Sequence, residues 1–185
     1  PHGPFPEAVE AMAAAAAHAN RYPDNEGYEL REALSRHLGV PSGAIWLGGG
    51  SSELLRTIAL AVGGPGTNAV YAWPSFVIYR LGSMWALSER REVPLDGEHR
   101  HDLGAMKDAI DNDTTVVYVC NPNNPTGTHL PTDDVLEFVD SLPERITVVV
   151  DEAYAEFVTA ADYRSLAAEA AERPNLIVTR TFSKI

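Results

Sequence analysis

The amino-acid sequence predicts an α/β fold in which a mainly parallel sheet is flanked by helices. Short apolar segments typical of strands alternate with longer amphipathic segments typical of helices along most of the 185 residues. The segment from Ile146 to Val150 is apolar after Thr147, as expected for a strand that is covered on both faces. Polar segments directly follow several predicted strands, and ligands bind at that end of the strands in such sheets.

Residues 1–40 are expected to form a helical arm beside a main unit of residues 41–185. The alanine-rich segment 7–19 favours a helix, which the segment around Pro23 interrupts. A second helix is expected at 29–38, where apolar side chains fall on one face and Gly39 ends the pattern.

The main unit is expected to alternate between strands and helices. Strands are expected at residues 45–47, 69–71, 91–95, 115–120, 146–150 and 176–179. Helices are expected at residues 52–62, 76–87, 103–110, 132–142 and 165–172. Thr132 is expected to cap its helix, with Asp133 and Asp134 in the first turn, where acidic groups interact favourably with the helix dipole.

Composition argues against several classes of protein. The formal net charge of −12 repels phosphate backbones, so no nucleic-acid partner is expected. No apolar run approaches the roughly 20 residues that cross a bilayer, so no membrane insertion is expected. Cys120 is the single cysteine, which fits a reducing cytoplasm without internal disulfides. The chain starts without a methionine or a signal peptide, so we expect it to be already in progress at Pro1.

Two turn-forming segments carry groups suited to ligand binding. Glycines 48–50 lead through Ser51 and Ser52 into a predicted helix, and free N–H groups at a helix start bind anions. A plain tight turn with a serine cap is the alternative. Asn124 lies in an asparagine-proline turn, where its amide suits a phenolate oxygen; a purely structural turn is the alternative.

Asp151 ends an apolar strand and is expected to point into a partly desolvated space. An unpaired carboxylate there would have a raised pKa, and pairing with a pyridinium would remove the penalty of burying the charge. A helix cap, a surface turn or a metal site with Glu152 are the alternatives. The histidines do not cluster, so no metal site is expected.

Lys184 follows Thr181 and Ser183 beyond the last predicted strand. Two hydroxyls beside a lysine can hold a phosphate while the amine reaches an aldehyde carbon. A surface lysine near a frayed end is the alternative, but the preceding strand and the other three polar segments favour a functional role. Cys120 has no basic neighbour and is expected to be a buried apolar group rather than a nucleophile.

These groups together meet the needs of pyridoxal phosphate. A lysine can form the Schiff base, and an acidic partner such as Asp151 can keep the pyridine nitrogen protonated. Tyr154 and Asn124 follow two other strand ends. The sequence therefore predicts that a lysine, a carboxylate, a phenol and an amide converge around one ring.

The chain resembles the fold-type I pyridoxal-phosphate aminotransferases, and within them the histidinol-phosphate aminotransferase branch. The matching segments are residues 20–23, 50–53, 74–76, 120–127, 150–154 and 179–184, in family order. The resemblance implies a cytoplasmic enzyme of histidine biosynthesis that transfers the amino group of histidinol phosphate to 2-oxoglutarate. It also implies that the main unit is the cofactor-binding large domain.

The resemblance implies a role for each matching residue. Lys184 would form the Schiff base and carry the proton of the 1,3-shift, and Asp151 would pair with the ring nitrogen. Tyr154 and Asn124 would bind the phenolic oxygen of the ring, and Phe76 would stack on its face.

Phosphate and dimer contacts are implied as well. The residues that would bind the cofactor phosphate are Ser51, Ser52, Thr181 and Ser183. Tyr22 would reach across an interface to the phosphate of a partner subunit, so a homodimer is implied. His2 lies where relatives border the substrate, often with an aromatic residue, and Ser52 stands where the branch commonly has an acidic residue.

The sequence departs from the family at its end. Relatives continue past the lysine with an arginine for the cofactor phosphate and with a small domain that supplies an arginine for the substrate carboxylate. We therefore expect this chain to be about the first half of the enzyme, with a truncated large domain and no C-terminal small domain. No transaminase activity is expected from these residues alone.

Three other functions remain open. An aromatic amino-acid aminotransferase shares nearly every motif, and a lyase or decarboxylase can use the same cofactor on the same fold. A non-catalytic regulatory module that keeps the fold would predict a fused DNA-binding segment, and the sequence has no trace of one.

Overall fold

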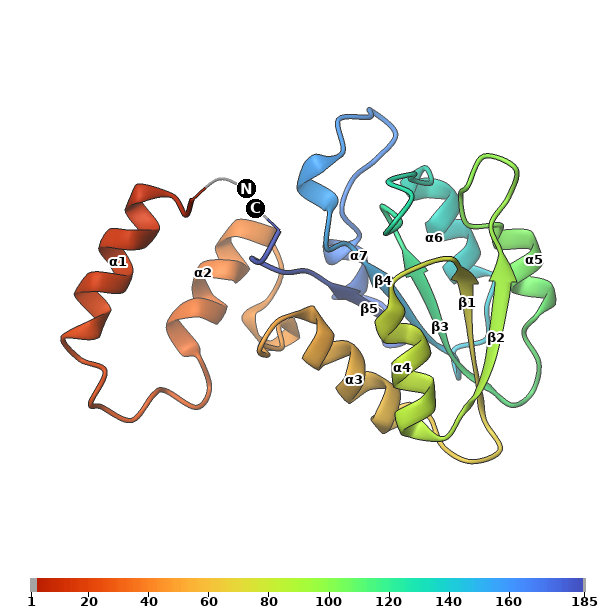
Figure 1. The fold of residues 1–185 in the computed structure, drawn as a ribbon, viewed down its shortest axis with the longest axis horizontal. Helices are drawn as coiled ribbons and strands as arrows, with labels where there is room; N and C mark the ends of the chain where they lie inside the picture. The colour runs from red at the N-terminus through yellow and green to blue at the C-terminus, as the bar shows by residue number, and fades with distance from the viewer. Residues whose placement is uncertain (1–2, 185) are drawn as a thin grey trace.

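The computed structural model describes residues 3–184 and contains a five-stranded parallel sheet (Figure 1). The strands are β1 (Asn68–Trp73), β2 (Glu89–Pro94), β3 (Thr114–Cys120), β4 (Thr147–Asp151) and β5 (Leu176–Thr179). Their order in the sheet is β2-β1-β3-β4-β5, and each neighbouring pair is parallel. The carboxyl ends of all five strands therefore lie at the same edge.

Helices cover both faces of this sheet, as the sequence predicts. The helices on one face are α3 (Ser51–Val62) and α4 (Val77–Ala86), and those on the other are α5 (Leu103–Asp108), α6 (Thr132–Asp140) and α7 (Ala167–Ala170) (Figure 1). Alternate residues of a strand point to opposite faces. Accordingly, Tyr71 of β1 packs toward α3 and α4, whereas Val70 packs toward α5 and α6.

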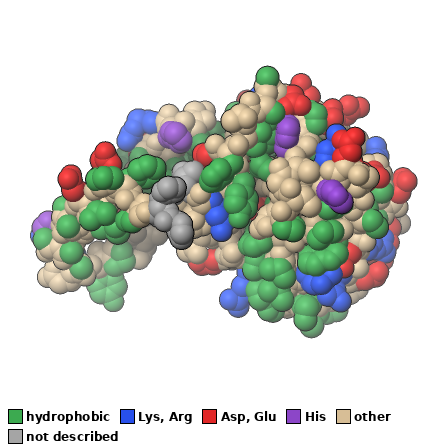
Figure 2. Space-filling model, turned by 45° about the horizontal axis from the view of Figure 1, so that its top comes forward, with side chains coloured by type: hydrophobic (Ala, Val, Ile, Leu, Met, Phe, Trp, Pro, Cys, Tyr) green, Lys and Arg blue, Asp and Glu red, His purple; other side chains and the backbone are tan. Residues whose placement is uncertain are grey.

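The arm consists of α1 (Pro6–Ala16) and α2 (Tyr28–Leu38), which lie to one side of the sheet (Figure 1). Neither helix contains a buried residue. Figure 2 shows hydrophobic side chains on the surface of this arm, and Phe5, Val9 and Met12 are among the exposed ones. The arm is tied to the main unit by the Arg31 guanidinium, which donates to the Ser42 carbonyl oxygen at 2.8 and 3.1 Å. A domain boundary at residue 40 stays a prediction.

The prediction of a strand at residues 45–47 is wrong. The segment is irregular backbone that follows a 3₁₀ turn, η1 (Ser42–Ala44), and Trp46 is exposed. Its apolar residues fit a strand, but within residues 3–184 it pairs with no strand of the sheet. A strand needs a hydrogen-bonded neighbour, so local composition did not decide the outcome here.

Thr132 is not the cap of its helix. Pro131 occupies the cap position of α6, and the Thr132 hydroxyl instead donates to the Arg164 carbonyl oxygen at 2.8 Å. The helix expected at 165–172 is also shorter than predicted: α7 spans Ala167–Ala170, and the Leu166 N–H just before it donates to the Glu152 carboxylate. At both places the groups bond to residues distant in sequence, which the local pattern does not reveal.

No helix in the part of the chain that the structure describes is long and apolar enough to cross a membrane.

Candidate active site

Asp151 is the last residue of β4, and its carboxylate is buried at the carboxyl edge of the sheet, with 1% of the residue exposed. Oδ2 accepts a hydrogen bond from the Tyr79 hydroxyl at 2.8 Å. Oδ1 accepts from the Thr179 hydroxyl at 3.0 Å and from the Ala153 N–H at 3.2 Å. Burial raises the pKa of Asp151, and the three donors oppose that rise by stabilising the ionised form.

Tyr154 and Asn124 line one cavity of about 450 Å³, a size suited to a small molecule. Tyr154 comes from the loop after β4, and Asn124 comes from the loop after β3. His129 and Phe157 also line the cavity. The structure thus brings together two side chains that the sequence placed at separate strand ends.

Lys184 lies beside Tyr154. Its Nζ atom is 5.6 Å from the centre of the Tyr154 ring, and the lysine is exposed. Just before it, the Thr181 and Ser183 hydroxyls are 2.9 Å apart, and the Ser183 N–H donates to the Thr181 hydroxyl at 3.1 Å. The segment after β5 therefore presents an amine and two neighbouring hydroxyls.

Ser51 and Ser52 form the first turn of α3, with Ser51 buried and Ser52 exposed. Gly50 precedes them with a φ of 90°, a backbone conformation that favours glycine. No side chain among residues 3–184 caps this helix, so its first N–H groups stay available to an anion. Because residues 45–47 are not a strand, these serines follow an irregular segment instead of a strand of the sheet.

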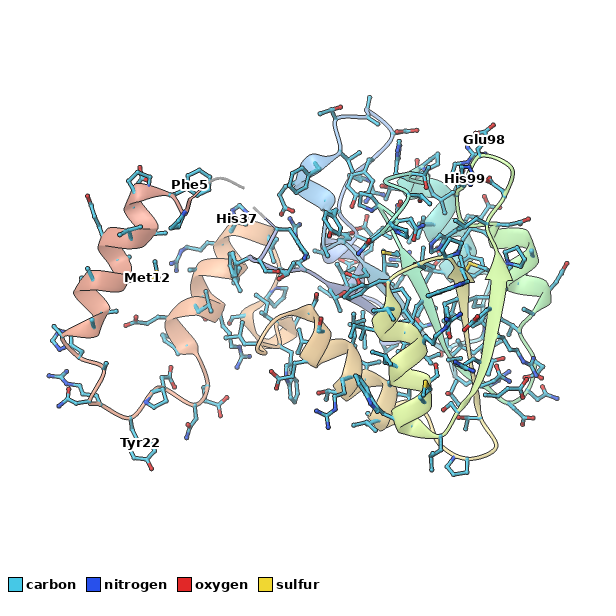
Figure 3. All side chains as sticks on the ribbon, in the orientation of Figure 1. Phe5, Met12, Tyr22, His37, Glu98 and His99 are labelled. Atoms are coloured by element: carbon cyan, nitrogen blue, oxygen red, sulfur yellow. The ribbon has the colours of Figure 1, made fainter. Side chains whose placement is uncertain are left out.

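Phe76 precedes α4 and packs edge-on against Tyr79, with 5.9 Å between ring centroids and 89° between ring planes. Tyr22, by contrast, lies on the arm with 97% of its surface exposed, and Figure 3 shows it apart from the sheet. The structure does not bring Tyr22 to the other predicted site residues within this chain. His2 falls outside the described residues.

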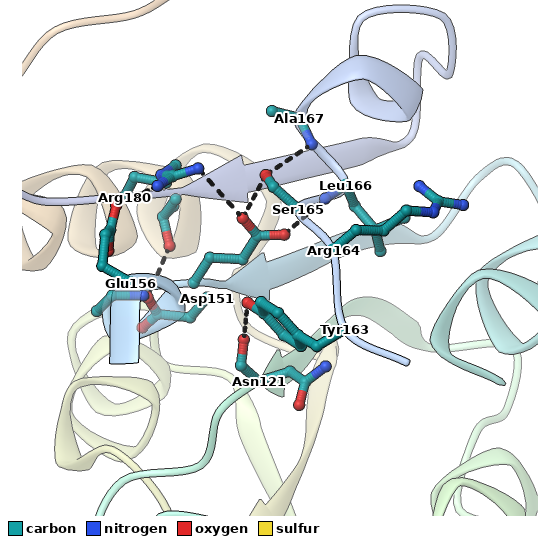
Figure 4. Close-up of polar contacts among 12 residues, drawn as sticks. Asn121, Asp151, Glu156, Tyr163, Arg164, Ser165, Leu166, Ala167 and Arg180 are labelled. Carbon is teal, nitrogen blue, oxygen red and sulfur yellow. Dashed lines mark hydrogen bonds and ion pairs between the residues drawn. The ribbon is translucent and has the colours of Figure 1, made fainter. Parts of the chain in front are cut away.

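Sequence reasoning missed the polar group that surrounds Glu152, the residue after Asp151. Glu152 is buried, and its carboxylate accepts from the Ser165 hydroxyl at 2.6 Å and from the Leu166 N–H at 2.7 Å. Arg180 lies 3.9 Å from the same carboxylate and also pairs with Glu156. The contacts around Arg180 and Ser165 are drawn in Figure 4. They tie the loop after β4 to the end of β5, and no local pattern could have shown this.

A second missed group joins the segment before α4 to the asparagine loop. Asn123 is buried and its Oδ1 accepts from the Ser75 hydroxyl at 2.8 Å, with His101 Nε2 at 3.1 Å. Its amide nitrogen donates to the Pro74 carbonyl oxygen at 3.2 Å. Burial lowers the pKa of His101 to about 4, so the ring is neutral near pH 7 and donates through Nε2.

Comparison with known proteins identifies the family. Residues 1–185 match the model of the family "Aminotransferase class I and II". The chain belongs to the class I and II aminotransferases. This membership confirms the predicted resemblance, and the parallel sheet with helices on both faces confirms the predicted fold class.

Several aminotransferases are similar over the whole chain. Histidinol-phosphate aminotransferase 1 of Nitrosococcus oceani is 43% identical over 185 residues, which are 100% of this chain and 50% of that protein. An aromatic amino acid aminotransferase of Thermobifida fusca is 45% identical over 184 residues, covering 100% of this chain and 51% of that protein. This aminotransferase chain thus spans about half the length of the curated relatives it matches.

Solved structures of other proteins have a similar fold. The histidinol-phosphate aminotransferase of Sinorhizobium meliloti, crystallised in complex with pyridoxal-5'-phosphate, has a TM-score of 0.92 and 32% identity, covering 98% of this chain and 49% of that one. A putative histidinol-phosphate aminotransferase of Erwinia carotovora atroseptica also has a TM-score of 0.92, with 33% identity, covering 100% of this chain and 54% of that one.

Proposed function

We propose that the intact protein is a pyridoxal-phosphate-dependent aminotransferase that uses histidinol phosphate as amino donor and 2-oxoglutarate as acceptor. The observation that carries this proposal is the meeting of Lys184 with Tyr154 at the edge of the sheet where Asp151 is buried. The names of the N. oceani and S. meliloti relatives support the choice of donor. A biosynthetic role in the cytoplasm is proposed with it.

The residues present fit pyridoxal phosphate. Burial raises the pKa of Asp151, because the ionised carboxylate is poorly solvated there. A protonated ring nitrogen is a cationic partner that would offset this penalty. The Asn124 amide and the Tyr154 phenol are donors that line one cavity, which suits a phenolate oxygen. Thr181 and Ser183 offer paired hydroxyls for a phosphate.

Each side chain has a distinct task in this proposal. Asp151 would hold a proton on the ring nitrogen, while Asn124 and Tyr154 would donate to the phenolic oxygen. Phe76 would lie against the ring. When bound, the cofactor supplies an electron sink that stabilises a carbanion at the donor carbon. Lys184 Nζ would be the covalent attachment point and would move the proton between the two carbons of the 1,3-shift.

The phosphate and the partner subunit complete the proposed site. Thr181, Ser183 and the N–H groups of Ser51 and Ser52 would bind the cofactor phosphate. Tyr22 would contact the phosphate bound by a second subunit, so a homodimer is proposed. The 97% exposure of Tyr22 and the exposed apolar side chains of the arm support this, because such surfaces are commonly covered by a partner.

An aromatic amino-acid aminotransferase is the second candidate. The 45% identity to the T. fusca enzyme favours it as much as the 43% identity to the N. oceani enzyme favours the first. Both candidates use the same cofactor and the same lysine, so they differ only in the donor.

A donor panel on the intact protein tests the proposal. Histidinol phosphate and phenylalanine would each be offered with 2-oxoglutarate, and glutamate formation would be followed. The proposal expects kcat/KM to be at least about tenfold higher for histidinol phosphate, a transition-state preference of about 1.4 kcal/mol. A preference for phenylalanine would select the second candidate. Release of carbon dioxide or phosphate without glutamate would instead indicate a decarboxylase or lyase.

A further inference from the structure

Tyr79 is tightly packed next to Asp151 of the candidate site. It lies on α4 with 1% of the residue exposed, and its ring stacks on Tyr118 with 4.7 Å between centroids and 12° between planes. Phe76 packs edge-on against the same ring, and Tyr71 lies at 6.1 Å. The phenol therefore has little freedom to turn away from the Asp151 oxygen to which it donates at 2.8 Å.

We propose that Tyr79 is a positioning residue for the reaction, because its hydroxyl orients the Asp151 carboxylate and shares the oxygen atom that would face the cofactor ring. This inference rests on the proposed function. It concerns a side chain that does not itself line the cavity of Asn124 and Tyr154.

The hydrogen bonds of Asp151 identify the shared oxygen. An ionised carboxylate has about four lone-pair sites, two on each oxygen. Oδ1 already accepts from the Thr179 hydroxyl and the Ala153 N–H, whereas Oδ2 accepts only from Tyr79. The site that remains for a ring N–H is therefore on Oδ2. A donor on that same oxygen affects its basicity most directly.

The surroundings of Tyr79 keep its hydroxyl a donor. Burial and the Asp151 carboxylate raise the pKa of Tyr79 well above its usual value, so the phenol stays protonated. Cys120 is the nearby thiol, and burial raises its pKa to about 12, so it stays neutral. Burial also raises the pKa of Tyr118. Among these neighbours, Asp151 is thus the charged group to which the Tyr79 hydroxyl donates.

Tyr79→Phe and Tyr118→Phe form a matched pair of variants for the intact holoenzyme. Both remove one hydroxyl from the same stack of rings, but Tyr79 donates to Asp151 and Tyr118 is not among its donors within residues 3–184. Removing the Tyr79 hydroxyl makes the carboxylate a stronger base, so it draws the ring proton toward itself. Less positive charge would then stay on the cofactor ring. The pH at which the visible absorbance of the bound cofactor changes would therefore rise.

Two readouts are expected to separate the variants. Y79F should raise the pH at which the visible absorbance titrates by about one unit and should lower kcat about tenfold, with the donor KM within about twofold of wild type. Y118F should leave the titration pH and kcat unchanged. In an Asp151→Asn background, adding Tyr79→Phe should cause no further shift of the absorbance.

The outcomes distinguish this inference from the proposed function. Equal titration curves and equal kcat for Y79F and Y118F would overturn it, as would a lower thermal midpoint for Y79F without any spectral shift. If Y79F does not fold, 3-fluorotyrosine placed at position 79 provides the second test, because its stronger donor should shift the titration to lower pH. Failure of the proposed function would show differently: without the cofactor the wild type itself would lack a visible band, and with another donor the band would remain while the donor panel changed.

Discussion

The side-chain nitrogen of Lys184 lies 5.6 Å from the centre of the Tyr154 ring. The two residues follow neighbouring strands, because β4 and β5 pair in parallel with Asp151 opposite Thr179. Both loops leave the sheet at the same edge, where β4 ends in the buried Asp151, so the amine and the phenol lie at that edge. This relationship is the basis of the predictions below, which apply to the intact protein.

Replacing Lys184 with alanine should abolish the visible absorbance of the bound cofactor, because the covalent attachment point is removed. Lys107 on α5 is the only other lysine of the 185 residues, and Lys107→Ala is the matched control, which should keep the band. Absorbance spectra of the purified variants are the measurement. A band that survives in K184A would show that this amine does not carry the cofactor.

Asp151→Asn should slow transamination by at least about a hundredfold, equivalent to about 2.7 kcal/mol, because an amide cannot stabilise a protonated ring nitrogen. Cofactor retention after dialysis should change much less. Asp140→Asn, which removes a surface partner of Arg173, serves as the control and should keep wild-type kcat. Wild-type turnover in D151N would refute the electrostatic role of this carboxylate.

Stability should fall as the pH drops from about 6.5 toward about 4 because of His101. Burial lowers the pKa of His101 in the fold to about 4 from an ordinary 6.5. The unfolded chain therefore binds a proton in this window that the folded protein does not, which favours unfolding by up to about 3 kcal/mol.

Denaturant titrations at a series of pH values test the role of His101. His101→Gln should flatten the acid side of the profile, whereas His37→Gln, at an exposed position of α2, should keep the wild-type slope. A profile of H101Q that parallels wild type between pH 4 and 6.5 would contradict the prediction.

Glu152→Ala should lower the free energy of unfolding by roughly 2–3 kcal/mol, because it leaves the Ser165 hydroxyl and the Leu166 N–H without their buried acceptor. Glu156→Ala is the control, since Glu156 also pairs with Arg180 but is exposed, and its loss should change stability by less than about 1 kcal/mol. Shifts in the denaturant midpoint measure both. Equal shifts would show that burial of Glu152 adds nothing.

The amino-acid sequence by itself determined the order of the elements after residue 50 and the chemistry at their ends. Apolar periodicity and turn residues act over a few positions, so the five strands from β1 to β5 and the helices between them could be predicted. A strand-end carboxylate, an asparagine turn and a lysine likewise carry their chemical meaning locally. The family resemblance rested on the same local motifs.

Only the tertiary structure decided which groups touch one another. The hydrogen bond from Thr132 to Arg164 and the donors around Glu152 depend on partners distant in sequence. The irregular backbone of residues 45–47 likewise reflects the lack of a neighbouring strand, which the local composition does not reveal. The same holds for Tyr79, whose place on α4 follows from helical periodicity but whose contact with Asp151 does not. Such contacts depend on how helices pack across a sheet and on strand register, and no short stretch of residues encodes either.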